Sequence, residues 1–259
     1  MSADQPRKSL GQHWLYDEDS LNAMISAGEV SADDTVVEVG PGLGTLTKKL
    51  CEKVSKVIAV ELDDLLVAQL PDRVKAKNLE VVHQSILDYD TSNLPKGYKV
   101  IANIPYYLTS NLIRIMLESP NPPSVMVLLI QKEVAERIVS KPGAMSILSV
   151  SVQFYGDAEL KELVPAKLFT PPPKVDSQII QIKLRHKPLF EDVDTEKFFK
   201  IVKAGFSEKR KKLRSSLSGG LQITKVEADE ILKNAKISPN TRAQELSLAD
   251  WRKIYKSLC

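Results

Sequence analysis

The chain has 259 residues, of which 43% are hydrophobic and 27% charged, as in an ordinary globular protein. This length suffices for one large domain and a small one. No apolar run approaches the roughly 20 residues that span a bilayer, and the polar N-terminus lacks the apolar segment of a secretory signal. Two cysteines and three scattered histidines exclude a disulfide framework and a Cys/His metal cluster. We therefore expect a cytoplasmic protein with no metal ion and no membrane partner.

The net charge of +3 is unevenly distributed along the chain. Residues 1–184 hold 19 Lys and Arg against 23 Asp and Glu, whereas residues 185–259 hold 17 against 10. An acidic body followed by a basic C-terminal part indicates a polyanionic partner that binds to that part. The alternative interpretation is an ordinary solvated helical surface.

The first two-thirds of the chain alternates short apolar runs with helical stretches. Such runs suit strands that are buried on both faces, and their alternation with helices predicts a mostly parallel, doubly wound α/β sheet of seven strands. The expected strands are residues 35–39, 57–61, 79–83, 99–102, 124–130, 157–165 and 177–184. The expected helices between them are residues 45–54, 63–76 and 110–118.

The pattern changes after the last expected strand. Three prolines in residues 168–175 predict an ordered, extended loop, because proline fits neither a central strand nor a helix interior. Beyond it, the sequence predicts only helices, at residues 195–206, 207–217, 225–235 and 249–257. We therefore expect two domains, an α/β domain of residues 1–185 and a small all-α domain of residues 186–259.

A glycine-rich turn follows the first expected strand, in the segment Glu38-Val-Gly40-Pro-Gly42-Leu-Gly44. Ligands of open α/β sheets bind at the carboxyl ends of the strands, where glycines let the backbone approach them. An acidic residue, Glu61, ends the next strand and suits the ribose hydroxyls of a nucleotide-like cofactor. Nicotinamide dehydrogenases and methyltransferases both use such an arrangement, but the Gly-x-Gly-x-Gly spacing favours a methyltransferase.

The fourth expected strand ends in Asn103-Ile104-Pro105-Tyr106, the most specific tetrad of the sequence. This tetrad resembles the one that amino methyltransferases of this fold carry at this place, which implies an adenine amine as the target. Such an amine is a poor nucleophile because the ring delocalises its lone pair. The side-chain oxygen of Asn103 and a backbone carbonyl near Pro105 can each accept one amine hydrogen, so that the lone pair turns toward a methyl donor. Tyr106 offers an aromatic face on which an extruded base can stack. The alternative is an Asn-x-Pro turn beside a packed tyrosine.

The sequence resembles the KsgA/RsmA family of ribosomal RNA adenine dimethyltransferases along nearly its whole length. Besides the glycine loop and the tetrad, four segments carry the resemblance: KSLGQHWL (8–15), QKEVAER (131–137), FTPPPKVDS (169–177) and FSEKRKKL (206–213). The resemblance implies a Rossmann-like class I methyltransferase fold that uses S-adenosylmethionine and releases S-adenosylhomocysteine. It also implies two adjacent adenosines near the 3′ end of small-subunit RNA as the targets, in an assembling 30S particle.

The resemblance assigns roles to particular residues. His13 and Leu15 would border the cofactor, and Gly40 and Gly42 would hold its methionine part. Glu61 would bind the ribose. Asn103 would stand between the cofactor and the target amine, and Pro105 would hold the neighbouring carbonyl. Tyr106 and Phe169 would enclose the adenine, although His13 as a capping residue and Phe169 as a core aromatic are milder alternatives.

Two positions depart from the family pattern. Ser85 stands where most relatives have an aspartate that accepts a hydrogen bond from the cofactor's adenine, so we expect weaker cofactor binding. Asp88 lies only three residues further on, but we do not expect it to compensate. Trp14 replaces the more usual phenylalanine, which should change packing more than chemistry.

A basic run lies on the expected helix 207–217. Such a run can neutralise several phosphates, but it reads no base sequence by itself. We therefore expect an RNA-binding surface, with a solvated helix face as the alternative. The basic residues are Lys209, Arg210, Lys211, Lys212 and Arg214.

These features predict an enzyme that dimethylates the N6 amine of adenosines in small-subunit ribosomal RNA. We expect it to act as a monomer, because no sustained heptad pattern appears. Two alternatives remain open, an Erm-type enzyme that acts on 23S ribosomal RNA and a non-catalytic RNA-binding factor in ribosome assembly. The proline-rich loop and the basic C-terminal segment favour the small-subunit enzyme, whereas Ser85 keeps the non-catalytic alternative open.

Overall fold

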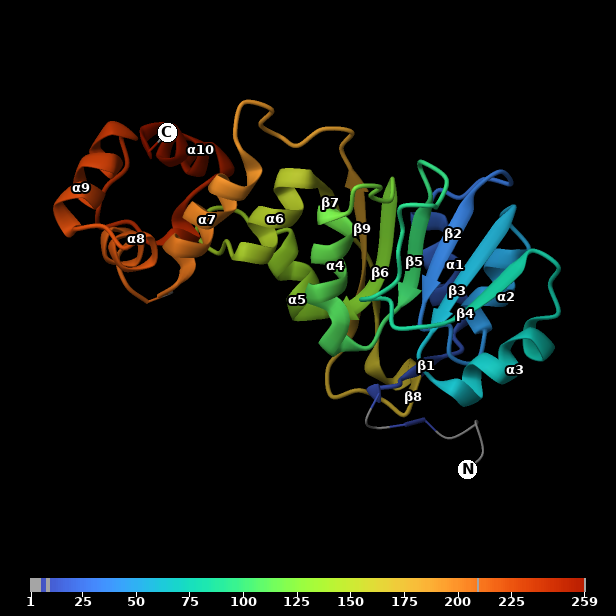
Figure 1. The fold of residues 1–259 in the computed structure, drawn as a ribbon. Coiled ribbons are helices and arrows are strands. Elements are labelled where there is room, and N and C mark those ends of the chain that lie inside the picture. Colours follow the sequence, from blue (N-terminus) through green and yellow to red (C-terminus); the bar gives the residue numbers. More distant parts are fainter. Residues whose placement is uncertain (1–5, 8–9, 209, 259) are drawn as a thin grey trace. The chain divides into compact units, whose positions relative to one another are not determined.

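The computed structural model describes residues 6–7, 10–208 and 210–258, which divide into two compact units (Figure 1). The first unit runs to Ala135 and adds Asp157–Leu184, and the second combines Glu136–Gly156 with the chain from Arg185 onward. The expected domain boundary at residue 185 coincides with one of these junctions. The inclusion of residues 136–156 in the second unit has no counterpart in the sequence analysis.

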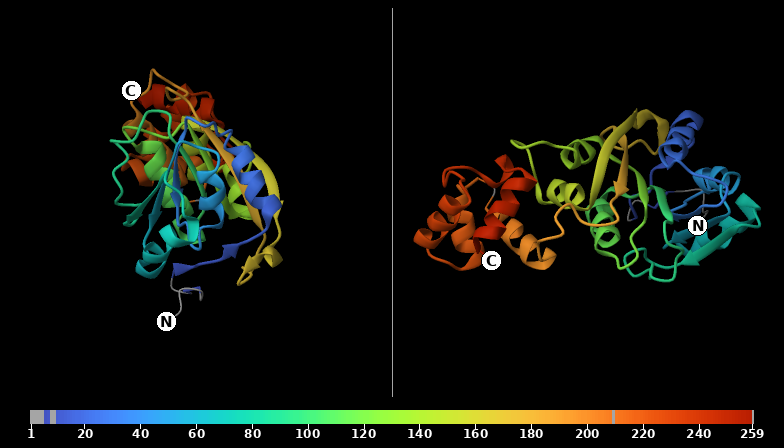
Figure 2. Two further views of the ribbon diagram at one scale, coloured as in Figure 1. Left: turned by 90° about the vertical axis from the view of Figure 1, so that its right-hand side faces the viewer. Right: turned by 90° about the horizontal axis from the view of Figure 1, so that it is seen from above.

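The first unit is built on a seven-stranded sheet with helices on both faces (Figure 2). The strands β4, β3, β2, β5 and β6 are parallel, and β9 pairs antiparallel with β6. This order confirms the predicted mostly parallel sheet of seven strands. In spatial order the strands are β4 (Leu79–His83), β3 (Lys56–Glu61), β2 (Thr35–Val39), β5 (Lys99–Asn103), β6 (Val125–Gln131), β9 (Ser177–Leu184) and β7 (Gly156–Val164).

The helices of this unit cover strands whose side chains alternate between two buried faces. Val57, Ile101 and Val127 pack in one hydrophobic cluster with side chains of the first two helices, as the period of two in a strand requires. The helices are α1 (Glu18–Ala27), α2 (Thr45–Cys51), α3 (Asp64–Val74) and α4 (Thr109–Glu118), and α5 (Lys132–Ile138) leads into the second unit. The 3₁₀ turns that lie fully within the described residues are η2 (Tyr106–Leu108), η3 (Ala166–Leu168) and η4 (Ala243–Glu245).

The proline-rich loop returns to the N-terminal segment of the chain. β8 (Phe169–Thr170) pairs antiparallel with β1 (Trp14–Leu15), with Trp14 opposite Thr170 and Leu15 opposite Phe169. This two-stranded ribbon joins segments that are more than 150 residues apart in the sequence. It gives the N-terminal segment a defined path along the carboxyl edge of the sheet.

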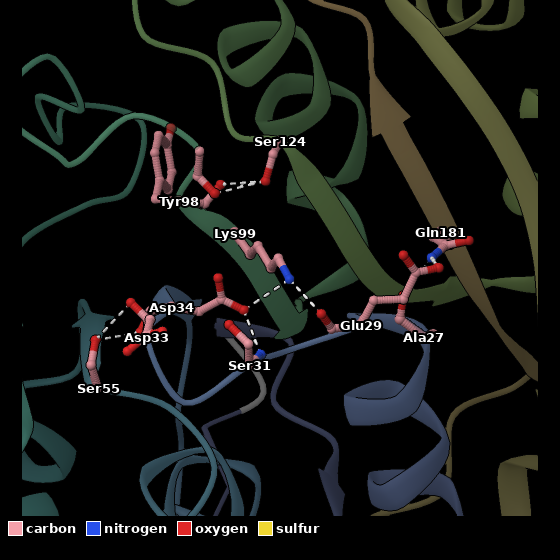
Figure 3. Close-up of polar contacts among 11 residues, drawn as sticks. Ala27, Glu29, Ser31, Asp33, Asp34, Ser55, Tyr98, Lys99, Ser124 and Gln181 are labelled. Atoms are coloured by element: carbon pink, nitrogen blue, oxygen red, sulfur yellow. Dashed lines mark hydrogen bonds and ion pairs between the residues drawn. The ribbon is translucent and has the colours of Figure 1, made fainter.

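Lys99 at the start of β5 stabilises the amino edge of the sheet through polar contacts (Figure 3). The ammonium group of Lys99 donates to the Glu29 carbonyl at 2.6 Å and pairs with Asp34 at 2.8 Å. Nearby, Gln181 of β9 donates to the Ala27 carbonyl at 2.6 Å. These contacts join the end of α1 to the sheet, at the edge opposite the carboxyl ends of the parallel strands.

The second unit contains five helices around an aromatic core. Phe154 of α6 stacks on Phe198 of α7, with ring centroids 4.9 Å apart, and Trp251 of α10 is fully buried. This arrangement confirms the predicted small helical part, to which α6 is added. The helices are α6 (Ile147–Tyr155), α7 (Thr195–Phe206), α8 (Leu213–Leu221), α9 (Lys225–Asn234) and α10 (Leu248–Leu258).

The helix predicted at residues 207–217 has the wrong bounds. Helix α7 ends at Ser207, whose hydroxyl donates to the Ala204 carbonyl, and a turn precedes α8. Helix α8 then continues through Gly219 and Gly220, beyond the expected end at residue 217. At Gly220 a β-carbon would lie 2.6 Å from the Cα of Ala204, so only glycine lets the two helices approach this closely. The described basic residues from Arg210 to Lys212 therefore lie in the turn, and Lys209 lies outside the described residues.

Candidate active site

A pocket opens at the carboxyl edge of the sheet, where β2, β3, β4 and β5 end. Five separate segments of the chain meet there, which is the place that doubly wound folds reserve for ligands. All of the residues that we predicted to bind the cofactor line this pocket. The lining comprises residues 10–15, 21, 38–43, 45, 46, 60–62, 84–86 and 103–108.

The glycine loop between β2 and α2 has the backbone conformation that its sequence predicts. Gly40, Gly42 and Gly44 have φ angles of 66°, 56° and 85°, in the left-handed region that favours glycine. Gly44 also packs closely, because a β-carbon there would lie 2.8 Å from side-chain atoms of Leu70 and Val74. The loop can therefore bring its backbone against a ligand and still close onto α3.

Glu61 at the end of β3 is held by the backbone around it. One carboxylate oxygen accepts from the amides of Leu62 and Asp63 at 2.8 and 3.0 Å, and the other accepts from the amide of Gly42 at 3.2 Å. Burial raises the pKa of the Glu61 carboxyl, and these amide bonds oppose the rise. Glu61 thus connects β3 to the glycine loop and lies beside the pocket.

Glu38 is a second buried carboxyl in the pocket wall, to which the sequence analysis gave no role of its own. It is 2% exposed, and its Oε2 atom has no hydrogen-bond partner among the described residues. Burial raises its pKa from 4.5 to about 8, the neighbouring Thr47 side chain opposes this rise, and the nearby Glu61 adds to it. An unpaired, buried acceptor in a pocket wall calls for explanation, because leaving it unpaired costs about 1–3 kcal/mol.

Asn103 lies at the end of β5 with its amide group oriented by the N-terminal segment. Its Nδ2 donates to the His13 carbonyl at 3.1 Å, which leaves Oδ1 as the free acceptor of the side chain. His13 is fixed in turn, because its Nδ1 lies 2.7 Å from the Pro171 carbonyl and donates to it. This contact between the N-terminal segment and the tetrad determines which amide atom of Asn103 is available.

Pro105 and Tyr106 continue the tetrad into η2. The Tyr106 hydroxyl forms a 2.6 Å hydrogen bond with the Ser177 hydroxyl, and burial raises its pKa. The ring of His13 stacks on the ring of Tyr106, with centroids 5.9 Å apart and planes at 23°. Tyr106 and Asn103 both line the pocket, and His13 lies against one face of the Tyr106 ring.

Phe169 does not reach the pocket. It is 3% exposed and packs in the same hydrophobic cluster as Leu15, Val164 and Ile179. The pairing of β8 with β1 sets Phe169 opposite Leu15, so the ring fills the core below the ribbon. The expectation that Phe169 and Tyr106 face each other across an adenine is not met in this conformation, in which His13 lies against Tyr106 instead.

Ser85 lines the pocket after β4, where the family pattern has an acid. Its hydroxyl oxygen accepts from the amide of Leu87 at 3.2 Å, as in a local side-chain turn. The hydroxyl retains one further lone pair for a ligand but carries no charge. The side chain therefore stands in the expected place with reduced electrostatic strength.

The basic segment of the second unit has polar neighbours. Lys211 pairs with Glu208 at 2.5 Å, Lys212 donates to Asn240 at 2.7 Å, and Arg214 pairs with Asp229 at 3.2 Å. Arg210 is exposed in the same turn. Exposed ion pairs are weak, so these side chains remain able to exchange their partners for phosphates.

The described part of the chain shows neither a metal-binding cluster nor a membrane-spanning helix. Its His, Cys, Asp and Glu side chains form no group of three or more that could hold a metal ion. Its helices include none with the length and apolar character needed to cross a membrane.

Comparisons with known proteins identify the family of the chain. The family model described as ribosomal RNA adenine dimethylase matches residues 3–259. The chain belongs to the ribosomal RNA adenine dimethylase family. Members of this family named ribosomal RNA small subunit methyltransferase A include one from Dehalococcoides mccartyi strain CBDB1, which is 42% identical over 96% of this chain and 87% of its own. Another, from Clostridioides difficile strain 630, is 38% identical over 94% of this chain and 88% of its own.

Solved structures of similar proteins share the whole architecture. A dimethyladenosine transferase from Plasmodium falciparum superposes with a TM-score of 0.79 at 26% identity, covering 93% of this chain and 96% of its own. The 23S rRNA methyltransferase ErmE gives a TM-score of 0.75 at 26% identity, covering 95% and 99%. The fold is thus that of the class I methyltransferases, and this dimethylase family member is an rRNA adenine methyltransferase.

Proposed function

We propose that the protein transfers methyl groups from S-adenosylmethionine to the N6 amines of two adjacent adenosines near the 3′ end of small-subunit ribosomal RNA. The observation that carries the proposal is the orientation of Asn103, whose Nδ2 is held by the His13 carbonyl so that Oδ1 remains as an acceptor in the pocket that Tyr106 also lines. The small-subunit target rests on the named relatives, which are 35–42% identical, whereas ErmE is 26% identical. An assembling 30S particle is the corresponding partner.

The residues of the pocket fit S-adenosylmethionine. The unpaired Oε2 of Glu38 suits the ammonium group of the methionine part, and a cation placed there would favour the ionised carboxylate. Gly40 and Gly42 would lie along the same part, Glu61 would bind the ribose hydroxyls, and Ser85 would accept from the adenine amine. When bound, this cofactor supplies a methyl group on a positively charged sulfur.

The chain's own residues then prepare the target amine. Asn103 Oδ1 accepts one N6 hydrogen, and a backbone carbonyl held near Pro105 accepts the other, so the nitrogen lone pair points at the methyl carbon. As the N–C bond forms, the S–C bond breaks and S-adenosylhomocysteine is the product. The methylated nitrogen carries a positive charge and loses one proton to water, so no strong base is needed. Tyr106 holds the base by stacking.

The test is a labelled-methyl transfer assay with unmethylated small subunits, naked large-subunit RNA and no RNA, and with Asn103→Ala as the control. We expect dimethyladenosine in small-subunit RNA only, and a fall of about 100- to 1000-fold in the variant, the range for loss of one transition-state hydrogen bond. Binding of S-adenosylhomocysteine to the variant should persist. Label in large-subunit RNA would move the target to that of ErmE, and RNA binding without any transfer would support a non-catalytic assembly factor.

A further inference from the structure

Tyr107 follows the tetrad and has no role in the mechanism above. It is the most exposed aromatic side chain in the described part of the chain, at 58%, yet it lines the pocket. A residue that is both exposed and part of the lining lies at the pocket mouth. No hydrogen bond joins its hydroxyl to another described residue. A large apolar ring therefore stands in solvent next to the reaction site.

The local backbone separates Tyr107 from Tyr106. Both belong to η2, and a 3₁₀ turn has three residues per turn, so successive side chains point about 120° apart. Tyr106 is directed inward, where its hydroxyl meets Ser177, and Tyr107 is directed toward the opening. One short turn thus presents two aromatic rings, one within the pocket and one at its mouth.

The Tyr107 ring is supported from one side by the N-terminal segment. A β-carbon built on Gly11 would lie 3.5 and 3.6 Å from Cδ1 and Cε1 of the ring. Gly11 has a φ of 61°, a conformation that other residues rarely adopt. The Gly11 backbone therefore lies against one face of the Tyr107 ring and restricts its motion. The other face remains open to a partner.

We propose that Tyr107 is a second base-stacking site, which binds the nucleotide next to the target adenosine. This inference rests on the proposed function. The neighbouring nucleotide is one phosphodiester away from the base in the pocket, so it must lie at the mouth, where the Tyr107 ring stands. Every base has a π-face that can stack on an aromatic ring, and a purine, with its larger ring system, stacks more strongly than uracil. A single exposed ring is too small for a protein partner, whose interface covers about 800 Å² on each side.

A stacking site at Tyr107 would explain why the two target adenosines are adjacent. When one adenosine occupies the pocket, the other stacks on Tyr107 and is held out of the surrounding RNA structure. The exchange of the two bases then needs only a short shift of the strand. Tyr107 therefore contributes to binding of the RNA and not to the chemistry of the amine.

The test measures KM for unmethylated small subunits with Tyr107→Leu, which removes the ring but keeps an apolar side chain. We expect KM to rise about 10-fold with kcat within twofold of its original value. Tyr107→Phe keeps the ring and should restore the original KM. Tyr16→Leu is the matched control, because Tyr16 is a tyrosine that is 48% exposed but does not line the pocket. Calorimetry with S-adenosylhomocysteine checks that the cofactor site of each variant is intact.

A second measurement identifies the contact with the base. Small subunits in which uridine replaces one of the two adjacent adenosines stack more weakly, so Tyr107→Leu should then raise KM less than twofold, a non-additive result. An unchanged KM in Tyr107→Leu, or a full 10-fold rise with both substrates, would overturn the inference. If the unmodified protein transfers no methyl group to any RNA, the proposed function itself is wrong. A KM that is unchanged by Tyr107→Leu in an active enzyme contradicts only the stacking inference.

Discussion

The adjacent glycines of α8 offer a matched pair of substitutions with opposite expected effects. Glycine in a helix interior costs up to about 1 kcal/mol relative to alanine, so propensity alone predicts that both Gly219→Ala and Gly220→Ala stabilise the protein. At Gly219 a β-carbon meets nothing within 4 Å. At Gly220 it would lie 2.6 Å from Cα and Cβ of Ala204 and 2.9 Å from its carbonyl oxygen.

The magnitudes follow from these surroundings. Gly219→Ala should raise the free energy of unfolding of the second unit by about 0.5–1 kcal/mol. At Gly220 the obstacle is mostly backbone, which cannot rotate away, so α7 and α8 must separate. Overpacking of this kind costs about 1–3 kcal/mol, which leaves a net loss of roughly 1–2 kcal/mol after the gain in helix propensity.

The assay is urea denaturation followed by the fluorescence of Trp251, which is fully buried in the second unit. The chain has two tryptophans, so a Trp14→Phe background makes the signal specific for that unit. Thermal unfolding should give shifts of several degrees in opposite directions, at about 4–8 °C per kcal/mol for a unit of this size. If Gly220→Ala proves as stable as Gly219→Ala, the close approach of α7 and α8 is not what requires the glycine.

Three further outcomes are expected. Because the pKa of Glu38 rises from 4.5 to about 8 on folding, the folded protein keeps a proton that the unfolded chain loses, and the free energy of unfolding should fall as pH rises through that window. Glu38→Gln should flatten this dependence in urea titrations at pH 5 and pH 8, and parallel curves for the two proteins would contradict the assignment. Ser85→Asp should tighten the binding of S-adenosylhomocysteine in calorimetry, and an equal affinity would refute the idea that Ser85 weakens the site. Lys99→Met should lower the free energy of unfolding by about 1–3 kcal/mol, since it leaves the Glu29 carbonyl and Asp34 without this partner, while cofactor affinity at the opposite edge of the sheet stays the same.

The sheet could be predicted from the sequence because its strands are buried on both faces. Runs such as residues 35–39 and 125–131 contain few polar side chains, and the glycine loop marks the end of a strand without ambiguity. Helix α6 escaped the analysis, since ILSVSVQFY combines β-branched residues with an apolar composition that also suits a strand. Its start is set by a capping box at Ser146, a signal that was present in the sequence.

In the candidate site, too, some features could be predicted from the sequence and others could not. Glycines, Glu61 and Asn103 could be placed because their roles follow from the ends of particular strands. The packing of Phe169 and the unpaired oxygen of Glu38 depend on which side chains surround them, and neighbours from distant segments are not readable from one sequence. The ends of α8 were mispredicted for a related reason, because the close approach of Ala204 to Gly220 is a tertiary contact.

The discontinuous second unit has a consequence for synthesis of the chain. Helix α6 leaves the ribosome well before α7 and α10, the helices that bury its apolar side chains. At 5–20 residues per second the face that contains Phe154 must wait roughly 5–20 s for the last helix. During that interval the nascent chain exposes an aromatic surface of the kind that chaperones bind. Truncation after residue 185 would make that exposure permanent, so the C-terminal helices cannot be removed as a separate module without also replacing the apolar residues of α6.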